Sequence, residues 1–375
     1  MSTLTNDDLR RYSRHLNIPE FGIEGQEKLK SAKVLIVGTG GLGSPSSLYL
    51  AAAGVGTIGL VEFDTVDYSN LQRQILFSDG QVGQAKIDAA EQRLREINPL
   101  ISIVKHPFRL DKSNVLALFN DYDVVLDGTD NFPSRYLIND ACVFTNTPNV
   151  HGSILRFEGQ ASVYNYNGPC YRCLYPEPPP ADAIPNCAEA GVLGVLPGLV
   201  GTIQATEAIK LICGIGKPLS GRLMMIDALN MQFRELRIKK DPACPVCGDE
   251  PTISELIEYR NECKMSEELS PYEITPAQVE AKKLDSTDDF ILVDVRQDHE
   301  RQLCNIGGEF IPLGEFAERY SELDKGKEIV IYCRSGARSG QATHFLLQNG
   351  YTNVKNMVGG ILRWSDDVDP SIPKY

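Results

Sequence analysis

The chain has 375 residues, which is too long for one ordinary hydrophobic core and predicts two domains of unequal size. Its 37 Lys and Arg residues stand against 50 Asp and Glu residues, for a formal net charge of −13. This acidity argues against a non-specific grip on nucleic acid and against binding to an anionic membrane surface. The first residues contain no apolar core of signal-peptide length, and the most apolar stretch, 191–201, is broken by Gly and Pro, so we expect a soluble, cytoplasmic protein.

Residues 30–150 alternate between short apolar runs and amphipathic stretches. The apolar runs are Lys33–Val37, Thr57–Glu62, Ile101–Val104 and Val124–Leu126. This βαβ rhythm predicts an α/β fold with a doubly wound parallel sheet. From His151 to Arg237 the runs become shorter and alternate, which predicts an extension by antiparallel strands around one strong helix, Leu196–Cys213. A proline-rich loop at 176–185 is expected to cross this half.

A glycine motif follows the first predicted strand, with the spacing Gly38-x-Gly40-Gly41-x-Gly43. Glycines at a strand-to-helix turn let the backbone approach a phosphate closely. The motif also fits the dinucleotide fingerprint, and Glu62 lies at about the distance expected for a ribose-binding acid. At this point an NAD-dependent oxidoreductase and an ATP-using enzyme are both open.

Polar and charged residues after the second strand favour ATP, because a triphosphate needs cations that a dinucleotide does not. They are Asp64, Asn70, Arg73 and Lys86. Asp130 follows the strand that ends at Leu126, where α/β sheets bind ligands and where Mg²⁺ could be held. Each has a simpler alternative: Arg73 and Lys86 as solvated surface charges, and Asp130 as a helix cap.

The ten cysteines include two Cys-x-x-Cys pairs, Cys170 with Cys173 and Cys244 with Cys247. Four thiolates of this kind are typical of structural Zn²⁺, although the pairs lie further apart in sequence than in an ordinary zinc ribbon. A redox dithiol is the alternative. Cys187 lies two residues after the proline-rich segment, in a predicted mobile loop, where exposure raises reactivity without proving a role.

Residues 250–270 are polar and charged and are predicted to be a linker between a domain at 1–249 and a smaller α/β domain at 271–375. The apolar runs of the second domain are Phe290–Val293, Ile329–Ile331 and Tyr351–Val354.

Cys333 stands where one of these runs ends, and we expect the next helix to start at Gly340. Backbone N–H groups of such a turn, together with Arg338, would stabilise a thiolate or a persulfide. The spacing is Cys-x4-Arg, one residue shorter than the Cys-x5-Arg loop of cysteine phosphatases, which favours sulfur over phosphate. A buried strand-end cysteine without chemistry is the alternative.

This loop resembles the active loop of rhodanese sulfurtransferases, and Asp294-Val295-Arg296 with Glu300 is similar to a second motif of that family. The resemblance covers residues 271–375. It implies that Cys333 carries a persulfide, held by the loop residues Arg334, Ser335, Gly336, Ala337 and Arg338.

Residues from about Asp7 to Asp249 resemble the MoeB/ThiF adenylyltransferases, which are relatives of ubiquitin-activating enzymes. The resemblance implies that MgATP adenylylates the C-terminal Gly-Gly carboxylate of a ubiquitin-fold sulfur carrier protein. Two residues depart from the usual pattern: Glu62 stands where aspartate is more usual, and His15 stands where glutamine is common.

The same resemblance assigns roles residue by residue. Arg14 would reach the triphosphate of the other subunit, which makes the enzyme an obligate homodimer, and Cys187 would trap the acyl group or help to release sulfur through a disulfide. The nucleotide would be held by Gly41, Glu62 and Asp64, the phosphates by Asn70, Arg73 and Lys86, Mg²⁺ by Asp130, and Zn²⁺ by Cys170, Cys173, Cys244 and Cys247.

The sequence therefore predicts an enzyme that adenylylates the carrier and then transfers sulfur from Cys333 to give a thiocarboxylate. A cysteine desulfurase or thiosulfate would supply the sulfur. Two alternatives stay open: an NAD-dependent oxidoreductase, and an activating enzyme for a ubiquitin-like modifier whose rhodanese-like module only binds.

Overall fold

The computed structural model describes residues 3–179, 190–257, 259, 269–285 and 289–375. The chain forms two compact units, Met1–Glu262 and Cys263–Tyr375, and the boundary falls inside the predicted linker. Each unit is described by itself. No helix in the described part of the chain is both long enough and apolar enough to cross a membrane.

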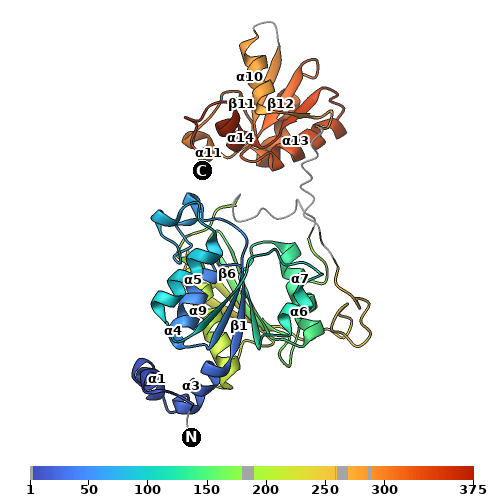
Figure 1. Cartoon of the computed structure of the whole chain (residues 1–375). Helices are drawn as coiled ribbons and strands as arrows, with labels where there is room; N and C mark the ends of the chain where they lie inside the picture. The colour runs from blue at the N-terminus through green and yellow to red at the C-terminus, as the bar shows by residue number, and fades with distance from the viewer. Residues whose placement is uncertain (1–2, 180–189, 258, 260–268, 286–288) are drawn as a thin grey trace. The chain divides into compact units, whose positions relative to one another are not determined.

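The first unit is built on one eight-stranded sheet in the order β3-β2-β1-β4-β5-β6-β7-β8 (Figure 1). Strands β3 to β5 of this order run parallel, and β5 to β8 pair antiparallel. This confirms the predicted parallel sheet with its antiparallel extension. The strands are β1 (Lys33–Val37), β2 (Thr57–Val61), β3 (Ser102–His106), β4 (Val124–Asp127), β5 (Asn149–Leu155), β6 (Glu158–Tyr164), β7 (Arg222–Asp227) and β8 (Gln232–Arg237).

Helices cover both faces of this sheet. One core lies beneath α3, α4, α5 and α9, and a second lies beneath α6 and α7 (Figure 1). The helices are α1 (Asn6–Arg11), α2 (Ser13–Leu16), α3 (Gly22–Ser31), α4 (Gly43–Ala53), α5 (Lys86–Ile97), α6 (Val115–Phe119), α7 (Phe132–Thr145) and α9 (Leu196–Cys213).

Helix α9 has the bounds that the sequence predicts. Pro197 occupies its first turn, where the missing N–H costs nothing, and Gly214 ends it in the left-handed conformation at φ 68°. The helix packs along α4 and against strands β5 and β6. A helix this apolar is buried on most sides, so its apolar sequence was enough to predict it without knowledge of the tertiary structure.

The second unit is a five-stranded, all-parallel sheet in the order β11-β10-β12-β13-β9. The strands are β9 (Glu273–Ile274), β10 (Phe290–Asp294), β11 (Glu309–Phe310), β12 (Glu328–Tyr332) and β13 (Val354–Met357). The helices are α10 (Pro276–Leu284), α11 (Asp298–Leu303), α12 (Leu313–Arg319), α13 (Ala337–Gln348) and α14 (Gly360–Asp367).

Two sequence predictions in this unit were wrong in their bounds. The last strand starts at Val354 rather than Tyr351, because the Tyr351 amide donates back to the Leu346 carbonyl and closes the end of α13. Helix α13 starts at Ala337 rather than Gly340, because Gly336 takes the left-handed conformation at φ 98° and turns the chain directly into the helix.

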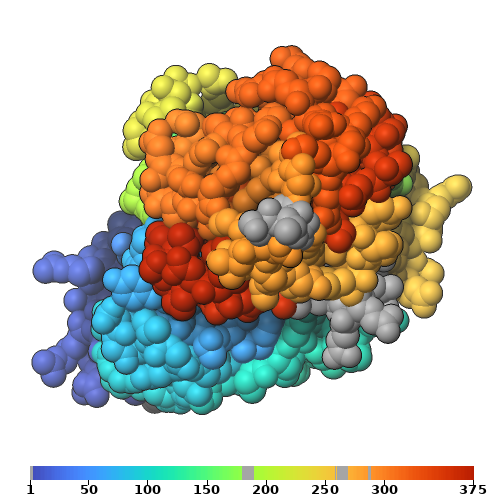
Figure 2. All heavy atoms as spheres, turned by 90° about the horizontal axis from the view of Figure 1, so that it is seen from above, coloured from blue at the N-terminus to red at the C-terminus, as the bar shows by residue number. Residues whose placement is uncertain are grey.

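The C-terminal residues, red in Figure 2, lie against the rest of the second unit. Ile372 and Tyr375 pack on a core cluster that contains Ile361 and the buried Trp364. This contact brings Tyr375 close to the Cys333 loop.

Candidate active sites and metal centre

The glycine motif forms a tight turn between β1 and α4. Gly38 has φ 86°, and a Cβ on Gly43 would lie 2.0 Å from the Gly38 carbonyl oxygen. Both positions therefore require glycine, one for its backbone conformation and the other for the close approach of helix to strand. The turn stands at the carboxyl end of β1, in the middle of the sheet, where α/β folds bind nucleotides.

Glu62 orders this turn. One carboxylate oxygen accepts hydrogen bonds from the Thr39 amide (3.0 Å) and hydroxyl (2.9 Å), and the other accepts from the amides of Phe63 (2.9 Å) and Asp64 (3.0 Å). The buried carboxylate thus has protein donors on both oxygens. Contact of Glu62 with a ribose stays a prediction.

The predicted phosphate cations lie on the segments that follow β2. A Cβ on Gly41 would lie 3.7 Å from Arg73 Cγ, which places that arginine against the glycine turn. Lys86 opens helix α5 with its side chain buried and its Nζ 3.4 Å from Asp64 Oδ2. Asn70 ends the short 3₁₀ turn Tyr68–Asn70, and its amide oxygen accepts from the Asp67 amide at 3.2 Å.

Gln74 belongs to the same group, although sequence reasoning missed it. It is 5% exposed, its Nε2 would lie 3.6 Å from a Cβ on Gly40, and within the described residues its Oε1 has no hydrogen-bond partner. A buried amide oxygen without a partner is costly, so Gln74 is a candidate contact for a ligand at the glycine turn.

Asp130 is exposed beyond the end of β4, and in the described chain it has no hydrogen bond or ion pair. The cap of helix α7 is Asn131, whose side chain accepts from the Ser134 amide at 3.0 Å. The alternative in which Asp130 itself caps the helix is therefore wrong. A carboxylate in this state is available to a cation.

Asp127, the last residue of β4, holds the turn that carries Asp130. The Asp127 carboxylate accepts from the Thr129 amide (3.0 Å) and hydroxyl (2.6 Å), and its other oxygen accepts from His151 Nδ1 (3.0 Å). Burial acts to raise the pKa of Asp127, but the His151 and Thr129 hydrogen bonds outweigh it and lower that pKa. Burial lowers the pKa of His151, so the pair is a carboxylate with a neutral imidazole.

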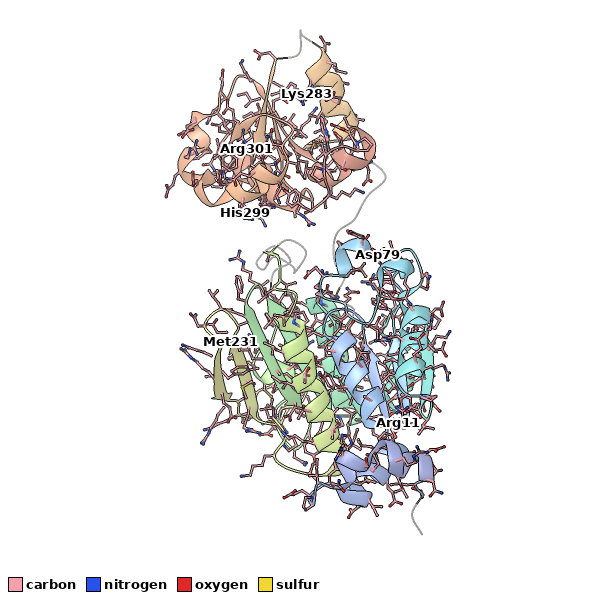
Figure 3. All side chains as sticks on the ribbon, turned by 90° about the vertical axis from the view of Figure 1, so that its left-hand side faces the viewer. Arg11, Asp79, Met231, Lys283, His299 and Arg301 are labelled. Atoms are coloured by element: carbon pink, nitrogen blue, oxygen red, sulfur yellow. The ribbon has the colours of Figure 1, made fainter. Side chains whose placement is uncertain are left out.

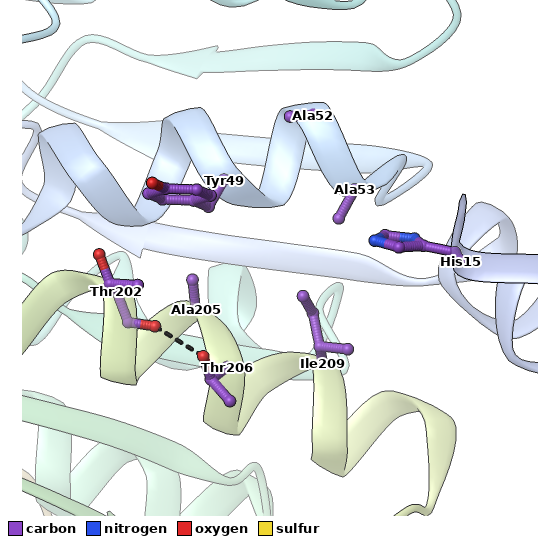
Figure 4. A pocket seen from close by; sticks show the side chains of 8 residues that line it. All are labelled: His15, Tyr49, Ala52, Ala53, Thr202, Ala205, Thr206 and Ile209. Atoms are coloured by element: carbon purple, nitrogen blue, oxygen red, sulfur yellow. Dashed lines mark hydrogen bonds between the residues drawn. The ribbon is translucent and has the colours of Figure 1, made fainter. Parts of the chain in front are cut away.

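Arg14 does not join the other predicted nucleotide residues of its own chain. It is exposed on α2, next to His15, which lies beside Ala53 at the C-terminal end of α4 (Figure 4). The glycine turn is at the opposite end of this 11-residue helix, about 16 Å away along its axis.

The four predicted metal ligands come together. Their sulfurs lie within 4.8 Å of one another, with Cys170 to Cys244 at 3.6 Å and Cys173 to Cys247 at 3.4 Å. A disulfide needs about 2 Å, whereas the sulfurs of a tetrahedral zinc site lie about 3.8 Å apart. The geometry therefore fits a four-thiolate metal site and not a redox disulfide. Bound Zn²⁺ itself stays a proposal.

Cys333 follows β12 and is 0% exposed. Its sulfur accepts a hydrogen bond from the Gly336 amide (3.1 Å) and lies 3.4 Å from the Ser339 hydroxyl. Ser339 also lies 2.6 Å from the Asn356 side-chain oxygen. These groups form a cradle around the sulfur at the start of a helix, where an anion is favoured, and Ser339 is a member that the sequence analysis missed. Stabilisation of a thiolate or persulfide there stays a prediction.

The loop arginines have partners of their own. Arg338 makes two bonds to Glu300, at 2.6 Å and 2.7 Å, and these raise its pKa. The Arg334 guanidinium stacks 5.6 Å from the Tyr375 ring, and the Tyr375 hydroxyl accepts from Arg296 at 2.7 Å. Tyr375 was not predicted, because a contact with a residue so far along the chain has no local sequence signal.

Three further predicted residues are Ser335, Ala337 and Cys187. Ser335 and Ala337 lie in the turn and at the helix start after Cys333. Cys187 falls outside the described residues.

These features define the class of protein: an α/β unit with a glycine turn at the carboxyl end of a parallel strand and a four-cysteine cluster that could hold a metal, joined in one chain to an α/β unit with a cradled cysteine. Comparison with known proteins agrees. The ThiF family model matches residues 12–246, and the rhodanese-like domain model matches residues 277–367. The chain belongs to the ThiF family and carries a C-terminal rhodanese-like domain.

Relatives that match the whole chain are named for two activities. The chain is 44% identical to the "Probable adenylyltransferase/sulfurtransferase MoeZ" of Mycobacterium tuberculosis, covering 100% of this chain and 97% of that protein. It is 42% identical to the "Adenylyltransferase and sulfurtransferase MOCS3-2" of Zea mays, covering 100% and 82%. A crystal structure of E. coli MccB with AMPCPP and MccA has 25% identity and a TM-score of 0.58, over 66% of this chain and 75% of that one.

Proposed function

We propose that this enzyme adenylylates the C-terminal Gly-Gly carboxylate of a ubiquitin-fold sulfur carrier protein and then transfers sulfur from a Cys333 persulfide to give a thiocarboxylate. One observation carries the proposal: a single chain holds both a nucleotide turn with cations and a cradled cysteine. The full-length match to relatives named for both activities supports it. Membership in the ThiF family favours it over the nicotinamide alternative.

The first step activates a poor electrophile. A carboxylate oxygen of the carrier attacks the α-phosphorus of ATP, the bond to the bridging oxygen breaks, and pyrophosphate leaves. Arg73 and Lys86, beside the glycine turn, would stabilise the charge that develops on the phosphates. The similarity to MccB, whose structure holds the ATP analogue AMPCPP, supports nucleotide binding at this edge of the sheet.

The donor sets also fit the two metals. Asp130 would hold Mg²⁺, which would neutralise phosphate charge, and the exposed, unpaired carboxylate is a suitable ligand. Cys170, Cys173, Cys244 and Cys247 would hold Zn²⁺ in a closed four-thiolate site, and such a site has a structural role without catalytic chemistry.

The second step replaces oxygen by sulfur. The terminal sulfur of the Cys333 persulfide attacks the acyl carbon, AMP leaves with the electron pair of the C–O bond, and the carrier is joined to Cys333 through an acyl disulfide. A second thiolate must then attack Cys333 Sγ to release the thiocarboxylate. We assign this thiol to Cys187, so that a Cys187–Cys333 disulfide forms and a cellular thiol later reduces it.

The persulfide itself needs a donor of zero-valent sulfur. A cysteine desulfurase would transfer it from its own persulfide, and thiosulfate would supply it with loss of sulfite. These thiol steps require a reducing compartment, which supports a cytoplasmic location.

An exposed sheet edge supports a protein as the partner. All six residues of β8 are exposed, among them Phe233 and Leu236. Met231, labelled in Figure 3, lies at the turn between β7 and β8 with 64% of its surface exposed, next to Leu229. Apolar side chains on an unpaired edge strand provide a docking surface for a folded carrier, as β-augmentation does elsewhere.

The position of Arg14 supports a homodimer. Since this arginine cannot reach its own nucleotide turn without crossing the length of α4, it would act on the site of a second copy. The face between α4 and α9 holds a cavity of about 200 Å³ beside the exposed Tyr49 (Figure 4). This face adjoins α2 and would lie at the interface.

Mixing two inactive variants tests the action of Arg14 on a second copy. Arg14→Ala and Asp130→Ala should each abolish ATP–pyrophosphate exchange. After subunit exchange, half of the dimers carry one intact site, so about one quarter of the activity should return. No recovery, with subunit exchange verified by mass, would place Arg14 outside the partner's site.

The overall reaction is tested on the mass of the carrier. With ATP and a sulfur donor, the Gly-Gly carrier should gain sulfur and lose oxygen, whereas a carrier lacking the last glycine should not react. Cys333→Ala should stop this change and leave the pyrophosphate exchange intact. If Cys333→Ala still yields thiocarboxylate, the module that only binds becomes the better interpretation; NADH binding without exchange would instead favour the oxidoreductase.

A further inference from the structure

The first part of the predicted linker is docked on the adenylylating unit. Ile253 packs against the cluster of metal-site cysteines, Leu256 against the core beneath α6 and α7, and Tyr259 against a tyrosine cluster that includes Tyr136 and Tyr171. The Ile253 amide also donates to the Pro245 carbonyl at 2.8 Å. We call the segment that carries Ile253, Leu256 and Tyr259 the strap.

Tyr259 is the most firmly held residue of the strap. Its hydroxyl accepts a hydrogen bond from Arg172 Nη2 at 2.8 Å, and its ring lies 5.6 Å from the Arg172 guanidinium and 5.7 Å from the Tyr136 ring. Tyr136 lies at 4.6 Å from the same guanidinium, so Arg172 contacts both rings. A desolvated cation is attracted to the face of each ring, so both contacts hold Tyr259 and Tyr136 against Arg172.

Arg172 is itself immobilised between the metal-site cysteines Cys170 and Cys173. It is 1% exposed and makes two bonds to Asp140, at 2.7 Å and 2.8 Å. Burial acts to lower the pKa of Arg172, but the bonds to Asp140 and Tyr259 outweigh it and raise that pKa. The buried charge is therefore fully paired, and its geometry follows that of the cysteine knuckle.

The same arginine holds the start of the loop that carries Cys187. Its Nη1 donates to the Pro176 carbonyl at 2.8 Å, and the Tyr136 hydroxyl lies 2.6 Å from the Glu177 carbonyl. One buried residue thus anchors two segments that the proposed sulfur transfer requires, namely the crossing loop and the tether of the rhodanese-like domain.

Docking of the strap shortens that tether. A chain leaving at Asp249 could span at most about 70 Å to Leu269, whereas a chain leaving at Tyr259 can span at most about 35 Å. The effective concentration of a tethered group falls roughly as the −3/2 power of tether length, so undocking would lower it about threefold.

We propose that Tyr259 is a positioning residue for sulfur transfer: clamped by Arg172, it sets the point from which the tether leaves and so raises the effective concentration of Cys333 at the acyl-adenylate. The inference rests on the proposed function, but it concerns only the second step. Within the described residues, neither Arg172 nor Tyr259 hydrogen-bonds to the glycine turn or to Asp130, so the two steps can be measured independently.

The test uses the full-length enzyme with Tyr259→Ala, and Tyr259→Phe as the conservative variant. Hydrogen exchange of the Ile253 amide should speed up in Tyr259→Ala, which reports release of the strap. ATP–pyrophosphate exchange with the Gly-Gly carrier should stay as in the unaltered enzyme, while single-turnover thiocarboxylate formation should slow about threefold. Tyr259→Phe keeps both ring contacts and should remain within about twofold of the unaltered rate.

Two controls separate positioning from other effects. Tyr272→Ala removes an exposed tyrosine after the tether and should change neither rate. An insertion of about ten Gly and Ser residues after residue 265 lengthens the tether with the strap still docked, and should reproduce the slower sulfur transfer. If Tyr259→Ala frees the Ile253 amide without slowing sulfur transfer, or slows both steps alike, the proposal is wrong. Absence of exchange in all variants would instead refute the proposed function.

Discussion

The glycine turn of the large sheet and the Cys333 loop of the small one are both strand-to-helix turns, but they hold their functional groups in opposite ways. At the large sheet, Asp130 is exposed and unpaired within the described chain, and Arg14 is a helix length away. At the small sheet, the sulfur is buried among donors, and Arg338 is bonded twice to Glu300.

The difference follows from what each site must accept. In the proposed function the open edge accepts MgATP and a protein terminus, which bring their own charges, and its carboxylate and cations stay available for them. A single sulfur atom brings only one charge, so its environment can be built completely in advance. Substitutions at the open edge should therefore affect catalysis without stability, and those at the cradle should affect both.

Asp130→Ala should have the largest effect. We expect ATP–pyrophosphate exchange to fall by at least about 1,000-fold, because the variant lacks the carboxylate that is proposed to hold Mg²⁺ against the phosphates. The melting temperature should stay within about 1 °C, since an exposed, unbonded side chain contributes little to stability. A drop of several degrees would show that the edge is not as open as its geometry indicates.

Gly43→Ala tests an exception to this rule, because Gly43 lies at the open edge but has a structural role. The added Cβ would meet the Gly38 carbonyl at 2.0 Å, and we expect a loss of about 3 kcal/mol in unfolding free energy from urea titration. Gly80→Ala is the matched control, because nothing lies within 4 Å of a Cβ at that position. Equal stability of the two variants would contradict the tight turn.

Glu300→Gln tests the cradle. It removes the charge that Arg338 faces and should cost about 2 kcal/mol at neutral pH. Burial opposes ionisation of Glu300, but bonds from Arg338 and the Gln297 amide lower its pKa below the ordinary 4.5. Its contribution is therefore complete above about pH 4.5 and is lost as the pH falls through the lowered value.

At acid pH, the free energy of unfolding should therefore fall less steeply with decreasing pH in Glu300→Gln than in the unaltered enzyme. We call this acidic part of the pH curve the acid limb. Glu315→Gln, at an exposed pair with Arg319, should leave the acid limb almost unchanged. Identical acid limbs for the unaltered enzyme and Glu300→Gln would show that Glu300 does not contribute to the pH dependence of stability.

Ser339→Ala should have the smallest effect. Loss of one hydroxyl at 3.4 Å from the sulfur should slow alkylation of Cys333 by iodoacetamide about fivefold, equivalent to about 1 kcal/mol. Peptide mass spectrometry isolates this thiol from the others. Ser321→Ala, an exposed position in the same unit, is the control, and equal rates would exclude Ser339 from the cradle.

Local patterns predicted the parts of the fold that local physics decides. The buried strand Lys33–Val37 and helix α9, with proline at its start and glycine after its end, could be placed from the sequence alone. The strand predicted at Tyr351–Val354 was misplaced by three residues, because the apolar Tyr351 packs as part of a helix end rather than in the sheet.

The sequence predicted which kinds of residue belong to the site, but not how those residues contact one another. Spacing indicated that Arg338 and Glu300 belong to one unit, but not that they pair with each other. Gln74 was missed because a single glutamine carries no pattern, and the docked strap was missed because Ile253, Leu256 and Tyr259 are few among polar neighbours. Such contacts depend on which distant surface the chain folds against, and no local period encodes that choice.

Trp364, buried in the second unit 5.0 Å from Lys283 Nζ, is the single tryptophan of the whole sequence. Indole emission excited near the red edge of the absorption band therefore comes from the rhodanese-like domain alone, although the adenylylating unit contains many tyrosines. The intact enzyme has a built-in optical probe for one half of the molecule, so the two units can be melted, titrated with acid or mixed with ligand in one cuvette and still be told apart.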